Sequence, residues 1–263
     1  MTTSWIQDGD TIYFVFQTGT TLKERTFDGA LTLSDTLGPA ISNTPGVYFL
    51  GEKRNFYCID EHGVLQDFQF DDEEGEWQPG ELAAVGAKPA LKSDIAVVAG
   101  PQDGGVQIFF QHVDGEIQSV QCDATGAWCS PSILPPVEPS ADLSIYAINS
   151  DAVIHVFYTS QDNSIHELVF GNEWIDSKIP HTESALKKHA LKAVPYEDGY
   201  LIQFNQFNDV DEEVYTVYKE EVTLVGKYHD GVFTKHRDAE GFNEEGAKPV
   251  ILNPSIIPRI KKP

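Results

Sequence analysis

The sequence repeats one short pattern five times. A glycine or asparagine, one spacer residue and a bulky apolar residue recur along the chain. The five copies are Gly29-Ala30-Leu31, Gly75-Glu76-Trp77, Gly126-Ala127-Trp128, Asn172-Glu173-Trp174 and Gly231-Val232-Phe233. The bulky residues are separated by 46, 51, 46 and 59 positions. A period of about 50 residues built from short strands is typical of a β-propeller, in which each repeat forms one blade.

Each repeat contains the same series of strand and turn signals. The expected first strands are 47–50, 95–98, 145–148 and 191–194, and the expected second strands are 12–16, 56–59, 108–111, 156–158 and 202–205. Tight turns follow the second strands at Thr18-Gly19, His62-Gly63, Asp114-Gly115 and Asp162-Asn163. Glycine and asparagine tolerate the positive φ that two-residue hairpin turns require. These signals predict antiparallel strands rather than helices.

The two ends of the chain suggest how the ring closes. The N-terminus begins with what reads as a second strand, and the segment 248–252 reads as an isolated first strand. We therefore expect the C-terminal strand to join the first blade, which would leave no free sheet edge. The expected fold is an all-β, five-bladed propeller that forms a single domain over residues 1–263. A sixth, degenerate blade inside residues 195–246 is the alternative.

Charge and composition exclude several classes of function. The chain has 41 acidic and 18 basic residues, for a net charge of −23. Nucleic acids and anionic membranes attract a positive face, so neither is an expected partner. The chain has no apolar run of the roughly 18 residues that a membrane span needs, and the N-terminus lacks a signal-like apolar region. These features predict a cytoplasmic protein.

Neither the cysteines nor the histidines predict a metal site. Cys58, Cys122 and Cys129 are too few for a disulfide framework and read as reduced thiols, although Cys122 and Cys129 flank one hairpin turn and their pairing stays open. The eight histidines are dispersed without ligand spacing. No phosphate-binding glycine loop or nucleophile elbow occurs. We therefore predict no metal and no cofactor.

Two stretches of the chain carry a family resemblance. They are Val106-Gln107-Ile108-Phe109-Phe110-Gln111 with Asp114-Gly115-Glu116-Ile117-Gln118 and Trp128, and Ile154-His155-Val156-Phe157-Tyr158 with Ile165-His166-Glu167 and Trp174. Both resemble the blade repeat of fungal fucose-specific lectins, which typically have six blades. The resemblance implies sugar sites between adjacent blades. There, an arginine at the head of the second strand and a glutamate on the third strand would bind sugar hydroxyls, and aromatic rings would cover the apolar face.

The arginine of those lectin sites is missing at every matching position. Its position falls on Tyr13, Asn55, Gln107, His155 and Leu201. The glutamate position falls on Glu24, Asp67, Ser119, Glu167 and, roughly, Glu213. Arg54 precedes Asn55 by one residue and is the one candidate to replace the lost arginine. Multivalent fucose binding is therefore not expected, and a lectin of altered specificity, with one residual site at His155 and Glu167, is an alternative function.

The chain also resembles the hetero-Diels–Alderases of fungal tropolone–sesquiterpenoid pathways, which are lectin-like and free of cofactors. This resemblance is based on the degraded lectin pattern and the composition. It implies dehydration of a hydroxymethyl tropolone or phenol to a quinone methide, followed by stereoselective cycloaddition to a humulene-type sesquiterpene. The implied partners are small polyketide and terpenoid molecules, and a homodimer is compatible with this description. The chemistry needs an orienting apolar pocket, exclusion of water and a general acid or base.

His155 and Glu167 are the first candidates for an acid–base pair. They occupy matching positions on neighbouring strands of one hairpin, where side chains can meet on one face. Tyr13 and Glu24 are the corresponding pair in the first repeat. The candidates for substrate contact are Trp5, Tyr48, Phe49, Arg54, Tyr146 and Trp174. The alternatives are core packing for the aromatic residues, an exposed polar face for the pairs, and a protein-interaction propeller without a small-molecule site.

Overall fold

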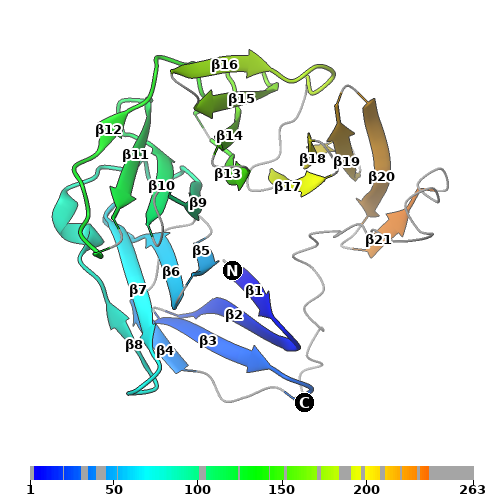
Figure 1. The fold of residues 1–263 in the computed structure, drawn as a ribbon. Helices are drawn as coiled ribbons and strands as arrows, with labels where there is room; N and C mark the ends of the chain where they lie inside the picture. Colours follow the sequence, from blue (N-terminus) through cyan, green and yellow to red (C-terminus); the bar gives the residue numbers. More distant parts are fainter. Residues whose placement is uncertain are drawn as a thin grey trace.

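The computed structural model describes residues 3–19, 21–30, 35–39, 46–51, 53–100, 105–123, 125–141, 143–150, 153–170, 173–183, 191–196, 199–207, 211–219, 221–229 and 232–236. These residues form five antiparallel sheets that lie around a common centre (Figure 1). Each sheet is built from consecutive strands, as expected for propeller blades. The prediction of an all-β propeller with five blades is confirmed.

Four blades contain four strands and the fifth contains five. Blades one and two contain β1 (Thr3–Asp8), β2 (Thr11–Thr18), β3 (Thr21–Phe27), β4 (Asp35–Pro39), β5 (Val47–Leu50), β6 (Arg54–Ile59), β7 (Leu65–Asp71) and β8 (Glu76–Pro79). Blades three and four contain β9 (Ile95–Ala99), β10 (Val106–Gln111), β11 (Ile117–Cys122), β12 (Ser132–Ile133), β13 (Ile145–Ser150), β14 (Val153–Thr159), β15 (Ile165–Phe170) and β16 (Trp174–Lys178). Blade five contains β17 (Lys192–Tyr196), β18 (Gly199–Phe207), β19 (Glu212–Tyr218), β20 (Glu221–His229) and β21 (Val232–Lys235). Between β8 and β9 lies one 3-10 turn, η1 (Leu82–Val85), and no helix in the described ranges is long and apolar enough to cross a membrane.

The first blade differs from the sequence prediction. Strand β1 pairs with β2 from Thr3 opposite Phe16 to Asp8 opposite Thr11, so this blade has a first strand of its own. The sequence reading missed β1 because Trp5 and Ile6 are adjacent and break the alternation of apolar and polar residues. The expectation that the N-terminus lacks a first strand is therefore wrong. The segment 248–252, which was expected to fill that place, lies outside the described residues.

The tight turns adopt the backbone conformations that the sequence predicts. Gly19, Gly63 and Gly115 have φ angles of 59°, 77° and 97°, and Asn163 has a φ of 63°. Each of these residues stands between the second and third strands of its blade. Positive φ at these positions gives the hairpins the twist that their strands require.

Apolar side chains fill the interfaces between adjacent blades. The first strands β1, β5, β9, β13 and β17 contact one another in that order, and four buried clusters hold successive blades together. The repeated tryptophans belong to these interfaces. The Trp128 ring lies edge-on against Tyr57 of the preceding blade at 6.2 Å, and Trp174 lies against Phe109 of its preceding blade at the same distance. In the second, third and fourth blades, the period seen in the sequence therefore marks one apolar contact with the preceding blade.

The register of the second and third strands agrees with the repeat in four blades. In each of these four blades, the residue at the glutamate position of the lectin pattern lies opposite a buried apolar residue of the second strand. The pairs are Val15 with Glu24, Tyr57 with Asp67, Phe109 with Ser119, and Phe157 with Glu167. In the fifth blade the equivalent pair is Gln203 with Thr216, whereas Glu213 lies opposite Gln206. The assignment of Glu213 was therefore wrong. Strand β18 is longer than its counterparts, which obscured the register in the sequence.

The three cysteines are free thiols. Cys122 pairs with Trp128 in an isolated bridge, and Cys129 is exposed. Burial raises the pKa of Cys122 to about 11, and the neighbouring Asp123 carboxylate adds to the effect. Cys122 and Cys129 therefore stand near one turn as separate thiols.

Replacing Phe109 with alanine should destabilise the protein strongly. Phe109 is 0% exposed and belongs to the cluster between the third and fourth blades, so Phe109→Ala would leave a cavity there. We expect a loss of about 3–5 kcal/mol in the free energy of unfolding, measured by urea denaturation. Val113→Ala is the control, because Val113 is 59% exposed and should change stability by less than about 0.5 kcal/mol. Equal losses in the two variants would contradict this packing.

Candidate functional site

Three polar side chains meet between the fourth and fifth blades. His155 comes from β14, Glu167 from β15 and Tyr200 from β18 of the next blade. His155 lies opposite Val169 and Glu167 lies opposite Phe157, so the two candidates are diagonal neighbours on one face. Glu167 Oε1 lies 2.8 Å from His155 Nδ1. The contact predicted from the sequence is therefore present, and we call the group of His155, Glu167 and Tyr200 the His155 cluster.

Tyr200 completes the cluster from the opposite wall. Its hydroxyl oxygen lies 3.0 Å from Nδ1 and 3.1 Å from Nε2 of His155. Burial raises the pKa of Tyr200, and the Glu167 carboxylate raises it further, so the phenol keeps its proton at neutral pH. An ionised carboxylate can only accept hydrogen bonds, so Glu167 favours the His155 tautomer with its proton on Nδ1. Nε2 is then the nitrogen that accepts from the Tyr200 hydroxyl.

The His155 cluster lies beside the apolar interface of these two blades. His155 is 7% exposed, and the Tyr200 ring packs on it at 4.6 Å between ring centroids. The same ring lies edge-on against Phe157 at 5.5 Å. Polar groups at the edge of an apolar surface experience a lower effective dielectric than in water, which strengthens their hydrogen bonds. The cluster can therefore donate to, accept from and exchange protons with a hydroxylated molecule.

The sequence interpretation did not identify Tyr200, because it followed the arginine position, which falls on Leu201. The repeat nevertheless contains a signal for Tyr200. Tyr200 precedes the buried Ile202 by two residues, as Arg54 precedes the buried Phe56 in the second blade. Residues at this position face the preceding blade, so they reach the same inter-blade site from its other side.

The interface between the first two blades contains a carboxylate that the protein itself neutralises. Glu24 is 1% exposed and binds three side chains of the second blade. Arg54 Nη1 lies 3.1 Å and 3.0 Å from its two oxygens, the Tyr48 hydroxyl donates to it at 2.5 Å, and Trp77 Nε1 donates to it at 3.2 Å. Burial raises the pKa of Glu24, and these bonds oppose the rise. We call this group the Glu24 cluster.

Arg54 is clamped between aromatic rings. Its guanidinium carbon lies 3.6 Å from the Phe70 ring centroid and 4.4 Å from that of Tyr13. Arg54 faces the first blade, whereas Asn55 alternates to the other face, so Arg54 is not a shifted copy of the lectin arginine. Tyr13 lies against Arg54 and is diagonal to Glu24, as His155 is to Glu167. The guanidinium therefore occupies the space beside Glu24 that an outside ligand would need.

At the interfaces between blades two and three and between blades three and four, the residue at the glutamate position is hydrogen-bonded within the protein. Asp67 accepts from the backbone N–H of Leu82 at 3.0 Å, and a Cβ at Gly80 would lie 2.1 Å from its Oδ2. Burial raises the pKa of Asp67. At the third interface the acid is replaced by the buried Ser119, which accepts from Gln107 Nε2 at 3.1 Å. Of the four interfaces between described blades, only the His155 cluster pairs an acid with an imidazole.

The structure places the other substrate-contact candidates in several regions. Tyr48 points to Glu24 rather than to a central pocket. Phe49 packs against the cluster between blades two and three, and Tyr146 against the cluster between blades four and five. Trp174 packs between blades three and four, on the opposite side of the fourth blade from His155. The backbone of Trp5 lies in β1, but its side chain lies outside what the structure describes.

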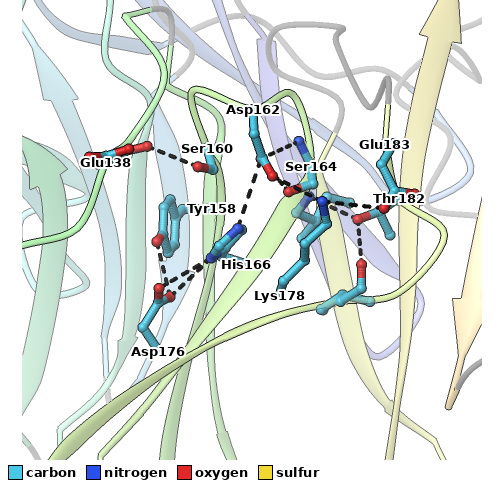
Figure 2. Close-up of polar contacts among 12 residues, drawn as sticks. Glu138, Tyr158, Ser160, Asp162, Ser164, His166, Asp176, Lys178, Thr182 and Glu183 are labelled. Atoms are coloured by element: carbon cyan, nitrogen blue, oxygen red, sulfur yellow. Dashed lines mark hydrogen bonds and ion pairs between the residues drawn. The ribbon is translucent and has the colours of Figure 1, made fainter.

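A second polar network lies on the fourth blade (Figure 2). His166 lies between Asp176, 3.2 Å from its Nδ1, and Asp162, 3.9 Å from its Nε2. The Tyr158 hydroxyl donates to Asp176 at 3.0 Å, and Lys178 binds Asp162 at 2.9 Å. The network links β16 to the turn between β14 and β15, and its half-exposed ion pairs contribute little stability. No three metal-ligating side chains are grouped anywhere in the described ranges.

Several solved structures resemble this fold. A fucose-specific lectin from Aleuria aurantia matches with a TM-score of 0.67 and 17% identity, over 87% of this chain and 78% of that chain. A second structure of the Aleuria aurantia lectin, described as a six-bladed β-propeller, matches with a TM-score of 0.63 and 16% identity, over 90% and 78%. The AofleA protein from Arthrobotrys oligospora matches with a TM-score of 0.52 and 15% identity, over 85% and 86%. At these identities the likeness shows the fold alone.

The sequence comparisons assign the family. No match was found among curated proteins. The family profile described as fungal fucose-specific lectin matches residues 49–233, which contain the third and fourth blades and nearly all of the second and fifth. Because this match spans more than half of the chain, the protein belongs to the fungal fucose-specific lectin family.

Proposed function

We propose that this protein binds a small hydroxylated ligand, such as a sugar, between its fourth and fifth blades. The observation that carries the proposal is the His155 cluster, in which the carboxylate of the lectin pattern is retained and an imidazole stands at the arginine position. Membership of a family of sugar-binding proteins supports it. The specificity differs from fucose recognition by arginine, because no arginine stands at any of the five matching positions.

The geometry suggests how such a ligand would be held. Glu167 uses Oε1 toward His155, and its Oε2 makes no hydrogen bond to any described residue. That oxygen is able to accept from a ligand hydroxyl, and the Tyr200 oxygen, whose proton is directed to His155, keeps a lone pair that can accept from a second one. The ring of Tyr200, held edge-on against the buried Phe157, provides an apolar surface for the C–H face of a ring. Because the Glu24 cluster is filled by Arg54, we expect binding at one site rather than at several.

A second candidate is the cofactor-free hetero-Diels–Alder reaction. The contact between Tyr200, His155 and Glu167 favours it, because these groups move protons in enzymes. His155 Nε2 would take the phenolic or tropolone proton of a hydroxymethyl substrate, and a proton returned to the hydroxymethyl oxygen would let it leave as water. The resulting quinone methide would add to the terpene alkene, forming one C–C and one C–O bond. The apolar interface would hold both partners and exclude water.

Glu167→Gln should weaken ligand binding. The change removes the charge from the acceptor, and hydrogen bonds to charged groups contribute about 1.5–3 kcal/mol. We expect at least a roughly tenfold loss of affinity for the best sugar from a glycan array, measured by titration calorimetry. Glu173→Gln is the matched control, since Glu173 is exposed on the same blade. If the native protein binds no sugar on the array, or if both variants bind with equal affinity, sugar binding at this site is contradicted.

His155→Ala tests the catalytic candidate. Native protein incubated with a hydroxymethyl tropolone and a humulene-type alcohol should give one stereoisomer faster than buffer does. Loss of the imidazole should slow this reaction by about 10²-fold or more, as for other general acids and bases. Chromatography on a chiral phase measures both rate and stereochemistry. A native protein that matches the protein-free mixture would exclude this reaction while leaving ligand binding intact.

Arg54→Ala should destabilise the protein without abolishing binding between blades four and five. The change leaves Glu24 buried without its cation, which costs about 3–5 kcal/mol for a buried pair. Thermal or urea unfolding measures the loss, and Arg54→Lys should recover only part of it, because lysine lacks the planar fork. Unchanged stability in Arg54→Ala would show that the guanidinium does not hold these blades together.

A further inference from the structure

The wall of the fourth blade continues outward from the His155 cluster as an apolar surface. Val169 of β15 lies opposite His155, and Ile175 of β16 lies opposite Val169. Residues directly opposite one another on neighbouring strands project from the same face of the sheet, with Cβ atoms about 5 Å apart. The three side chains therefore form one row from His155 to the outer edge of the blade. We call Val169 and Ile175 the apolar shelf.

The apolar shelf faces the fifth blade. Side chains alternate along a strand, so Val169 shares its face with Ile165, and Ile175 shares its face with Ile179. Ile165 and Ile179 are both buried in the apolar cluster between blades four and five. The shelf therefore lies on the same wall as the His155 cluster rather than on the side of the third blade.

Exposure to solvent increases along this row. His155 is 7% exposed, Val169 is half-buried, and Ile175 is 60% exposed. The two blades are in contact at their inner strands β13 and β17 and diverge toward β16 and β20 (Figure 1). On the facing wall, Val222 of β20 is half-buried and packs against the same apolar cluster. The outer part of this interface therefore leaves apolar side chains in contact with water.

Polar and apolar groups lie in adjacent rows on this wall. Ser177 of β16 is exposed and lies opposite Glu167, next to the row of Val169 and Ile175. Sites for small molecules combine an apolar lining with a few polar groups that fix the orientation of the ligand. A molecule that is hydrogen-bonded to Glu167 or Tyr200 lies within reach of the apolar shelf, because the shelf begins directly beside His155. The wall therefore matches a ligand with hydroxyls on one part and an apolar body on another.

We propose that the ligand of the His155 cluster carries an apolar substituent of about the size of one ring, and that this substituent binds on the apolar shelf. This inference rests on the proposed function, because the cluster has to hold the hydroxylated part of the same molecule. The ligand class is then an amphiphilic small molecule, such as an aryl glycoside, rather than a free sugar. A free sugar would leave Val169 and Ile175 in water, whereas an aryl group removes apolar surface of both from it.

Matched pairs of glycosides test the apolar shelf. Methyl and phenyl glycosides of the common hexoses are titrated into the native protein by calorimetry. We expect the phenyl glycoside to bind about tenfold more tightly than the methyl glycoside of the same sugar, because part of the phenyl ring and of the shelf leaves water. Ile175→Ser should remove this preference and leave the affinity for the methyl glycoside unchanged.

Two further variants separate the shelf from other effects. Ile133→Ser is the matched control, since Ile133 is 64% exposed on β12, the outer strand of the third blade, and this variant should keep the preference for phenyl. Glu167→Gln should weaken the binding of both glycosides and keep their ratio, because it alters only the site for hydroxyls.

Three outcomes would overturn the inference. Equal affinity of the native protein for both members of a pair, or a phenyl preference that survives in Ile175→Ser, excludes the apolar shelf while leaving sugar binding at the His155 cluster intact. A preference that is lost equally in Ile133→Ser shows unspecific adsorption to exposed apolar side chains. If neither member of any pair binds, the proposed function fails together with this inference.

Discussion

The contact between each blade and the one before it holds this propeller together. A single sheet of three to five strands buries only one of its faces well, so each blade depends on its neighbour for the other. The tryptophans that recur once per repeat supply part of this contact. Trp128 packs against Tyr57, and Trp174 packs against Phe109. The order of the first strands around the centre follows from the same packing.

The same interfaces hold the candidate sites, so stability and binding compete for one location. In the Glu24 cluster the second blade supplies Arg54, Tyr48 and Trp77, and the acid is satisfied within the protein. In the His155 cluster the partner from the next blade is Tyr200, a neutral group that leaves the carboxylate with an open oxygen. The residue at one equivalent position, Arg54 in the second blade and Tyr200 in the fifth, therefore decides whether the interface holds a structural ion pair or a candidate ligand site.

The repeat was sufficient to predict five blades, the positions of the turns and the contact of His155 with Glu167. Each depends on local spacing, which hairpin geometry converts directly into position. Strand β1 was missed because Trp5 and Ile6 break the alternation, and Glu213 was assigned wrongly because β18 is long. The cytoplasmic location, the homodimer, and the absence of nucleic-acid and membrane partners stay predictions from composition.

The sequence by itself determined the architecture and the loss of the lectin arginines, since both follow from counting positions along one chain. Only the tertiary structure decided what replaces those arginines. Arg54 reaches Glu24, and Tyr200 reaches His155, from an adjacent blade. The distances between side chains of different blades depend on how the sheets pack against each other. That packing is set by the summed apolar contacts of the ring rather than by any local pattern.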